Sequence, residues 1–389
     1  MRYAVLREGK ALLMIADPEA ARAPHGIEPA WLPVFYNPRM TFNRDLSVLA
    51  LEAYTAYYAP HKPIHLVDAL SGTGVRAIRY SLETSHVETV HANDIDPLAC
   101  RVIQENIILN GLKDRVVAHC RDAISLLTEL RRKEPLLFID VDPFGSPAPY
   151  SQQALKATGH KGLAAFTATD LAVLEASKPQ AARRKYWVEA VKVPESKEVG
   201  VRILLGYLAR VAASLDKSVR PLLAYYADHY YRVYLLVERG AKKADAMLRE
   251  HVGTVTYCPA IGKSFVKDGE ACPNGVKIGP LWVGGLFDKD YLEKLLLLVE
   301  RYKYLPTYRR IIKLLSDIYR EAQVCSSCIY YRLDTIASKL KTNLPPIRGL
   351  VQELEDRGYK AARTHFDPAG IRTDAPFQVV ADLIRGWWR

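Results

Sequence analysis

A strand, a glycine-rich turn and a helix follow one another at residues 65–80, and this order restricts the fold more than any other stretch of the chain. An apolar run ends at Asp68, Gly72 and Gly74 follow, and a helix-forming stretch begins directly after them. The glycines remove side chains that would keep a ligand from the backbone, and the N–H groups of the helix start point into the gap. The pattern therefore predicts a ligand-binding turn at the end of a strand.

Strands and helices continue to alternate after this turn. Asp94 follows the second strand, about 20 residues after Gly74, where a nucleoside-binding fold places the carboxylate that binds its ribose. This alternation predicts an α/β domain with a largely parallel sheet and a final hairpin. The expected strands are 65–68, 88–93, 116–119, 136–139, 164–170, 219–228 and 230–238, and the expected helices include 97–110 and 200–214.

The turn is compatible with two cofactors. An NAD-binding turn usually carries a third glycine, but Ala77 stands at that place. S-adenosylmethionine suits the surrounding acids better, with Asp68 and the turn beside its methionine portion and Asp94 on its ribose. Asp122, which Ala123 follows, would then hydrogen-bond the adenine amine. These features favour a methyltransferase over a dehydrogenase, which remains the alternative.

A second candidate feature lies at residues 136–150. An apolar run leads into Asp140 and Asp142, and Pro143-Phe144-Gly145 then ends any regular structure. Because ligands bind outside the carboxyl ends of parallel strands, a carboxylate, a proline-fixed backbone and an aromatic ring delivered there could meet a planar amine. The plain alternative is a strand that ends in a turn with a helix-capping Asp.

Residues 31–45 are rich in aromatic residues, proline and arginine. The segment is too broken for a helix and too apolar for a free linker, so we expect an ordered lid over the core. Phe35 and Arg44 would be among its ligand-contacting residues, and a packed arm with buried rings is the alternative. A helix is expected to begin at Asp45 as its N-terminal cap.

The composition indicates a cytoplasmic globular protein with a polyanionic partner. The 389 residues predict two domains, 1–240 and 241–389, and the net charge of +11 favours an acidic partner such as a nucleic acid. No stretch is long and apolar enough to span a bilayer, and the start lacks the features of a signal peptide. The basic run 178–186, beside Trp187, suits either a solvated face or nucleic-acid contact.

The C-terminal half contains four of the six cysteines. Cys258 and Cys272 resemble half of a zinc ribbon, but two thiolates do not complete a tetrahedral site, and Cys325 and Cys328 form an isolated C-x-x-C. We therefore predict no metal site, although the sequence does not decide whether these four cysteines are disulfide-bonded, metal-bound or free. A basic helix at 302–313 and a winged-helix-like tail, with two short helices and a strand, predict a second nucleic-acid surface.

Seven short motifs spread over nearly the whole chain resemble one family, the tRNA (guanine-26-N2) dimethyltransferases known as Trm1, in their archaeal type. No single motif is specific, but the combination is. The motifs are FYNPRMTFNRD at 35–45, DALSGTGVRAIR at 68–79, ANDI at 92–95, DPFGSP at 142–147, TATD at 167–170, THFDP at 364–368 and TD at 373–374.

The resemblance implies a class I, Rossmann-like S-adenosylmethionine-dependent methyltransferase domain, an α+β C-terminal domain that binds tRNA, and guanosine 26 of tRNA as the acceptor. Asp142 would be the catalytic carboxylate, with Phe35 and Phe144 sandwiching the base, and the Pro143 carbonyl could help to hold the amine. By the same resemblance, the donor-binding residues are Arg44, Arg76, Asp94, Asp122 and Ala123, and they would join Asp68, Gly72 and Gly74 of the turn.

Two other functions stay open at this point. An adenine-N6 methyltransferase would share the D-P-aromatic loop, but it is expected to carry a second proline and a tyrosine where Phe144 and Gly145 stand. A non-catalytic RNA-binding protein with a residual cofactor fold is the other alternative. The sequence shows no sign of an obligate protein partner, and it leaves open the number of methyl groups, a neighbouring target guanine and the oligomeric state.

Overall fold

The computed structural model describes residues 2–23, 26–60, 62–258, 265–266, 272, 274–325 and 328–388. The chain divides into two compact units that interleave along the sequence. The first consists of residues 1–167, 234–239 and 293–313, and the second of 168–233, 240–292 and 314–389. The division into residues 1–240 and 241–389 therefore stays a prediction.

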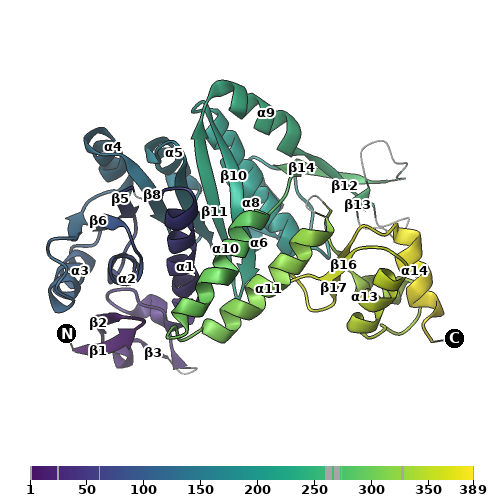
Figure 1. The fold of residues 1–389 in the computed structure, drawn as a ribbon, viewed down its shortest axis with the longest axis horizontal. Helices are drawn as coiled ribbons and strands as arrows, with labels where there is room; N and C mark the ends of the chain where they lie inside the picture. Colours follow the sequence, from purple (N-terminus) through teal and green to yellow (C-terminus); the bar gives the residue numbers. More distant parts are fainter. Residues whose placement is uncertain are drawn as a thin grey trace. The chain divides into compact units, whose positions relative to one another are not determined.

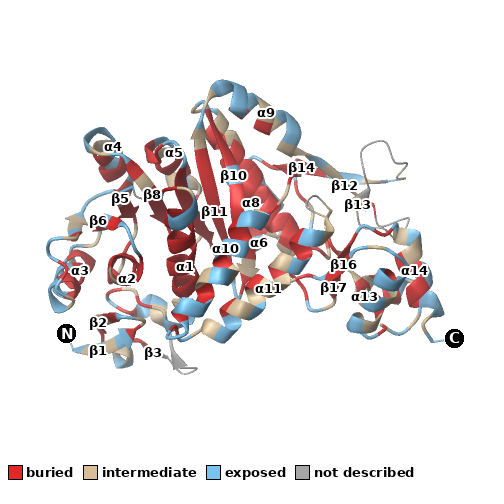
Figure 2. Ribbon diagram, in the orientation of Figure 1, coloured by how far each residue is buried: buried red, intermediate tan, exposed pale blue. Residues whose placement is uncertain are grey.

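A seven-stranded sheet has the order β10-β11-β9-β8-β5-β6-β7 (Figure 1). The pairs β5/β6, β5/β8, β6/β7 and β8/β9 are parallel, as the alternation of strands and helices predicted. Every residue of β9 is buried, and Figure 2 shows the strands largely in the buried colour. The strands are β5 Ile64–Asp68, β6 Val87–Asp94, β7 Val116–Cys120, β8 Leu136–Val141, β9 Gly162–Ala168, β10 Lys217–Ala227 and β11 Tyr230–Arg239.

Five helices of the first unit follow the predicted alternation. Asp96 caps α3 through the Leu98 N–H, and Asp122 caps α4 through the Ser125 N–H at 2.8 Å. These helices are α1 Thr41–Tyr57, α2 Val75–Glu83, α3 Pro97–Leu109, α4 Ala123–Lys133 and α5 Ala148–Ala157. Two short hairpins precede them, formed by β1 Tyr3–Glu8 with β2 Ala11–Ala16 and by β3 Arg22–Ala23 with β4 Gly26–Ile27.

The first long helix begins earlier than predicted. Helix α1 starts at Thr41, so Asp45 lies inside it, and the predicted cap at Asp45 is wrong. The Asp45 carboxylate instead accepts hydrogen bonds from the Thr307 N–H at 3.1 Å and hydroxyl at 2.6 Å, and it pairs with Arg79. Residues 29–31 and 38–40 form the 3₁₀ turns η2 (Pro29–Trp31) and η3 (Pro38–Met40). Only the part of the segment before Thr41 is thus too broken for an α-helix.

The second unit contains the remaining α-helices and two small sheets. Helices α10 and α11 cross the unit borders, and the helix predicted over 302–313 begins only at Tyr308. Pro306 explains the delay, because it lacks an N–H and disfavours helical geometry in the residue before it. The helices are α6 Leu171–Leu174, α7 Pro179–Tyr186, α8 Ser196–Ala213, α9 Ala241–His251, α10 Lys289–Val299 and α11 Tyr308–Val324; η5 Glu300–Tyr302 is a 3₁₀ turn.

The C-terminal residues form a compact winged-helix-like cluster. The strands β15 Tyr331–Arg332, β17 Gly370–Thr373 and β16 Ala361–Arg363 pair in that order, beside α12 Leu333–Lys339 and α13 Ile347–Asp356. A third helix, α14 Phe377–Gly386, was not predicted. Apolar side chains from all three helices and β17 share one core, which includes Leu333, Leu350, Ile371 and Ile384. The other small sheet consists of β13 Phe265–Val266, β12 Val252–Tyr257 and β14 Val276–Trp282.

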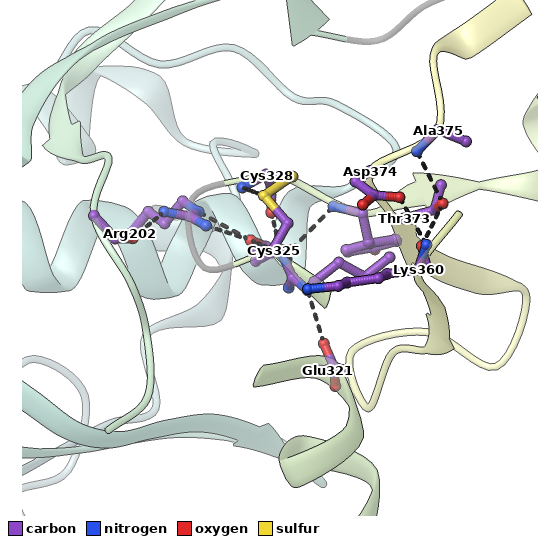
Figure 3. Close-up of a disulfide and its surroundings, with 12 residues drawn as sticks. Arg202, Glu321, Cys325, Cys328, Lys360, Thr373, Asp374 and Ala375 are labelled. Carbon is purple, nitrogen blue, oxygen red and sulfur yellow. Dashed lines mark hydrogen bonds and ion pairs between the residues drawn. A yellow bond between two sulfur atoms is a disulfide. The ribbon is translucent and has the colours of Figure 1, made fainter. Parts of the chain in front are cut away.

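All six cysteines are paired, which answers the question that the sequence left open. Cys100–Cys120 links α3 to the end of β7, and Cys258–Cys272 and Cys325–Cys328 are the other disulfides. Cys325–Cys328 follows α11 (Figure 3). The Cys328 carbonyl accepts a hydrogen bond from Arg372. Arg372 is buried and also pairs with Glu321 at 3.2 Å and Glu198 at 2.9 Å. Among the described helices, none has the length and apolar character that crossing a bilayer requires.

Candidate active site

Three neighbouring strands deliver acidic residues to one edge of the sheet in the first unit. Asp68 ends β5, Asp94 ends β6, and Asp142 follows β8 directly. Asp68 lies opposite Asp140 in the parallel register of β5 and β8. Because these strands run parallel, their carboxyl ends meet where open α/β sheets bind ligands. The structure thus brings together three of the predicted site residues.

The glycine turn lies between β5 and α2 as predicted, and one of its positions requires glycine for a further reason. Gly72 and Gly74 have φ values of +54° and +78°, which side chains rarely adopt, and Gly74 precedes α2. A Cβ on Gly72 would lie 3.0 Å from the carbonyl oxygen of Phe35. Position 72 therefore requires glycine because the backbone of the N-terminal segment, at Phe35, lies too close for a side chain. The Gly72 N–H donates to the Asp94 carboxylate at 2.8 Å.

Asn93, within β6, joins the loops that follow β5 and β7, a role that the sequence did not predict. Its side-chain amide donates to the carbonyls of Ala69 at 3.1 Å and Arg121 at 3.0 Å. Its backbone N–H donates to the Ser71 hydroxyl at 3.0 Å. Asn93 is fully buried, and a buried amide needs hydrogen-bond partners. A polar residue at the end of an apolar strand was therefore the feature of the sequence that could have predicted this role.

Asp94 and Asp122 are both held by backbone N–H groups. Asp94 accepts from Gly72 and, at 3.1 Å, from Asp96. Asp122 is the N-terminal cap of α4, and Ala123 behind it is buried. These contacts fix both carboxylates in place. Their contacts with the ribose and adenine, and that of Ala123, stay predictions.

Asp68 is buried, and the charge of Arg76 and the side chain of Ser71 offset the effect of burial on its pKa only in part. It is 1% exposed, and neither carboxylate oxygen has a hydrogen-bond partner among the described residues. Burial raises the pKa of Asp68 to about 7, and the nearby Asp140 carboxylate adds to this rise. Leaving such a group unpartnered is costly, so the position fits a ligand that brings a positive charge or a donor. The orphaned oxygens therefore support the predicted cofactor contact of Asp68.

Asp142 forms an ion pair with Arg76, and Arg76 is itself held by several other groups. The buried Arg76 guanidinium donates to the Ser47 hydroxyl at 2.8 Å and to the side-chain Oδ1 of Asn43 at 3.0 Å. The Ser47 hydroxyl also bonds to the Tyr234 hydroxyl at 2.8 Å. The Asp142 side chain is still 20% exposed, so it is both fixed and accessible. The guanidinium of Arg76 faces Asp142 in this structure, and the predicted contact of Arg76 with the donor stays a prediction.

The loop after Asp142 carries an exposed aromatic ring. Pro143 is buried, Phe144 is 69% exposed, and α5 begins only at Ala148, so Asp142 does not cap that helix. The rings of Phe144 and Phe35 meet edge to face, with centroids 4.4 Å apart and planes at 74°. Both predicted ring residues are thus neighbours. A base can lie between them only if they separate and become parallel.

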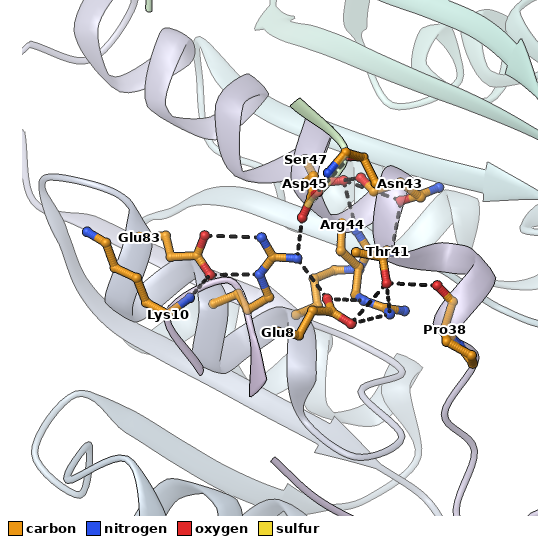
Figure 4. Close-up of polar contacts among 12 residues, drawn as sticks. Glu8, Lys10, Pro38, Thr41, Asn43, Arg44, Asp45, Ser47 and Glu83 are labelled. Atoms are coloured by element: carbon orange, nitrogen blue, oxygen red, sulfur yellow. Dashed lines mark hydrogen bonds and ion pairs between the residues drawn. The ribbon is translucent and has the colours of Figure 1, made fainter. Parts of the chain in front are cut away.

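Arg44 occupies a buried ion-pair network (Figure 4). Its guanidinium donates to Glu8 at 2.7 and 2.5 Å and to the Asn37 carbonyl at 3.1 Å. Burial by itself would raise the pKa of Glu8, but the charges of Arg44 and Arg79 bring it well below its usual range. Tyr36 is buried and its hydroxyl donates to Glu8 at 2.8 Å. At this residue the segment is a packed arm with a buried ring, the alternative to a lid. The predicted contact of Arg44 with the donor stays a prediction.

Residues 21–385 match a family model described as "N2,N2-dimethylguanosine tRNA methyltransferase". The chain belongs to this family. It is similar over 99% of its length to two proteins named tRNA (guanine(26)-N(2))-dimethyltransferase. The protein of Aeropyrum pernix is 44% identical with 97% of its length covered, and that of Saccharolobus solfataricus is 40% identical with 99% covered. Membership in the dimethylguanosine methyltransferase family confirms the resemblance in the motifs.

A solved structure of the same family has the same fold. The complex of Trm1 from Pyrococcus horikoshii with S-adenosyl-L-methionine superposes with a TM-score of 0.86 and 33% identity. The similarity covers 98% of this chain and 99% of that one. The predicted fold class, a Rossmann-like methyltransferase domain with an α+β C-terminal part, is thereby confirmed.

Proposed function

We propose that this chain transfers methyl groups from S-adenosylmethionine to the exocyclic N2 of guanosine 26 in tRNA. The observation that carries the proposal is the full-length match to the dimethylguanosine tRNA methyltransferases, among them relatives at 40 to 44% identity. The chain is accordingly a tRNA (guanine(26)-N(2))-dimethyltransferase in its activity. The geometry of Asp142 supports this chemistry, because an accessible carboxylate stands at the carboxyl edge of the sheet.

The donor-binding residues surround the glycine turn. S-adenosylmethionine supplies, when bound, a methyl group made electrophilic by its sulfonium. The unpartnered carboxylate of Asp68 would pair with the positive charge of the methionine portion, and the turn that contains Gly72 and Gly74 would lie beside it. Asp94, fixed by two backbone N–H groups, would accept the ribose hydroxyls, and Asp122 with Ala123 would hold the adenine.

Asp142 would accept the proton of the guanine amine. The lone pair of this amine is delocalised into the ring, so the nitrogen attacks only if its proton can leave as the methyl group arrives. A carboxylate in hydrogen-bond reach provides this acceptor. Arg76 holds Asp142 in one orientation, and the Pro143 carbonyl would hold the second amine hydrogen, so that N2 lies in line with the methyl group.

Phe35 and Phe144 would receive the base outside the tRNA stack. An enzyme that modifies a base within a helical stack must swing it out, which costs a few kcal/mol. Two aromatic faces offset part of that cost. Phe144 is 69% exposed, and an added Cβ on Gly145 would meet nothing within 4 Å, so there is open space beside this loop.

The basic character of the chain fits the polyanionic substrate. With a net charge of +11, phosphate contacts would contribute much of the tRNA affinity, which should fall steeply with salt. We assign residues 1–240 to methyl transfer and 241–389 to tRNA binding. We place the activity in the cytoplasm, where such a substrate occurs.

Mass spectrometry of nucleosides tests the proposal. The purified chain alone, since no obligate protein partner is proposed, is incubated with S-adenosylmethionine and an unmodified tRNA transcript. We expect N2-methylated guanosine from the wild-type transcript and none from a transcript with adenosine at position 26. The same spectra distinguish one added methyl group from two. N6-methyladenosine as the product, or no product at all with intact tRNA binding, would overturn the proposal.

A further inference from the structure

An exposed tryptophan ends helix α7 in the second unit. Trp187 is 55% exposed, and its backbone is left-handed, with φ 52° and ψ 48°. This conformation is unfavourable for a bulky residue, and glycine usually occupies it after a helix. Ending the helix therefore does not explain a tryptophan at this position. Strained backbone of this kind is concentrated at functional sites.

The indole of Trp187 packs against another ring, and the backbone of Trp187 is held by hydrogen bonds. The ring of the buried Tyr207 meets it with centroids 5.1 Å apart and planes at 62°. Arg210 donates to the carbonyls of Trp187 at 3.0 Å and Tyr186 at 2.7 Å, and its guanidinium lies 6.0 Å from the indole ring. A ring held in this way loses little freedom when a second flat group stacks on its exposed part.

The surroundings of Trp187 are positively charged. Residues 176–188 contain four lysine and arginine residues and no acidic residue. Arg183 pairs with Glu189 at 2.6 Å, and Lys185 lies 3.6 Å from Asp170. Arg184 is exposed, and within the described parts of the chain its side chain shows no ion pair or hydrogen bond. It stands one helical turn before Trp187, a spacing that brings side chains to the same face.

We propose that Trp187 and Arg184 form a docking surface for an unpaired nucleotide of the tRNA. The base stacks on the indole, and Arg184 contacts an adjacent phosphate. Every base has a flat π face, so this contact adds affinity without reading sequence. The basic residues of 176–188 favour a polyanion as the partner. The exposed Trp187 ring, packed on Tyr207, favours a nucleic acid with unstacked bases. This inference rests on the proposed function in one respect, which is that the bound RNA is a tRNA.

Equilibrium binding of an unmodified tRNA transcript, measured across a series of salt concentrations, tests this surface. Trp187→Ala should weaken binding by about 10-fold, the effect expected for the loss of one stacked base. The salt dependence should stay as in the wild type, because no charge is lost. Arg184→Gln should instead lower the slope of log affinity against log salt by about one. Trp187→Phe keeps a flat ring and should retain most of the affinity.

Two matched variants and two further measurements make the result specific. Tyr3→Ala removes another exposed ring, and Arg132→Gln removes an exposed arginine of α4; both should bind tRNA like the wild type. Trp187→Ala should raise KM for tRNA and leave kcat and the calorimetric affinity for S-adenosylmethionine unchanged. Trp187→Ala binding within 2-fold of wild type, or an equal loss in the control variants, would overturn the inference. A wild-type chain that binds tRNA but does not methylate it would overturn the proposed function alone.

Discussion

Arg76 forms an ion pair with Asp142 across 66 residues of sequence, and the same guanidinium contacts Asn43 and Ser47. We expect Arg76→Lys to lower kcat on the order of 10- to 100-fold, because one ammonium group cannot hold three acceptors in the same geometry. Calorimetry should show an unchanged affinity for S-adenosylmethionine. If the affinity falls while kcat holds, Arg76 acts on the donor and not on Asp142.

Asp142→Asn tests the proton acceptor itself. The amide has nearly the same shape, but it cannot take up the amine proton, so we expect the rate of methyl transfer to fall by on the order of 10²- to 10⁴-fold. Single-turnover kinetics with preformed enzyme–tRNA complex measure this step directly. Donor binding should survive. A variant that turns over at the wild-type rate would remove Asp142 from the proposed role.

Phe144→Ala tests the base-holding rings. Removing one stacking face should lower kcat/KM for tRNA by about 10-fold, since a stacked base gains roughly 1–3 kcal/mol from an aromatic partner. Phe144→Tyr keeps the face and serves as the control. A tRNA carrying 2-aminopurine at position 26 reports the swing of the base as a rise in fluorescence, which Phe144→Ala should reduce. Equal rates for both variants on full-length tRNA would contradict the sandwich.

Donor binding should depend on pH through Asp68. The pKa of Asp68 in the free protein is about 7, so the carboxyl is largely protonated at pH 6. A cationic donor favours the ionised form, so its affinity should rise with pH and level off above about 7. Calorimetry at pH 6 in two buffers of different ionisation enthalpy should show one proton released on binding. Asp68→Asn should abolish this release; a release that persists would place the proton on another group.

His119 should make the fold sensitive to acid. Burial, then the neighbouring His91 and Arg121, lower its pKa to about 4, below the value of about 6.5 for an unfolded histidine. Between these values the unfolded chain binds a proton that the folded chain does not, so stability falls as pH falls from 6.5 towards 4. Glu129 opposes the shift and Lys133 adds to it. Thermal melts at pH 8 and pH 5 should show a smaller loss of Tm for His119→Asn than for the wild type.

Much of the site followed from local patterns. Asp68, Asp94 and Asp142 each come at the end of an apolar run, and the sequence predicted that these strands are parallel with a ligand outside their carboxyl ends. The family resemblance then assigned all three residues to one site. Asp45 was assigned as a helix cap from its position in the chain, and that prediction was wrong because α1 begins at Thr41.

The partners of the buried charges were decided only by the tertiary structure. Arg44 pairs with Glu8, Arg76 with Asp142 and Asp45 with Thr307, and the intervals of 36, 66 and 262 residues carry no signal in the sequence. The same holds for the pairing of Cys100 with Cys120. The physical reason is the range of the forces involved. Strand and helix periodicity acts between near neighbours along the chain, whereas a buried charge is satisfied by whichever group the completed packing brings within about 3 Å.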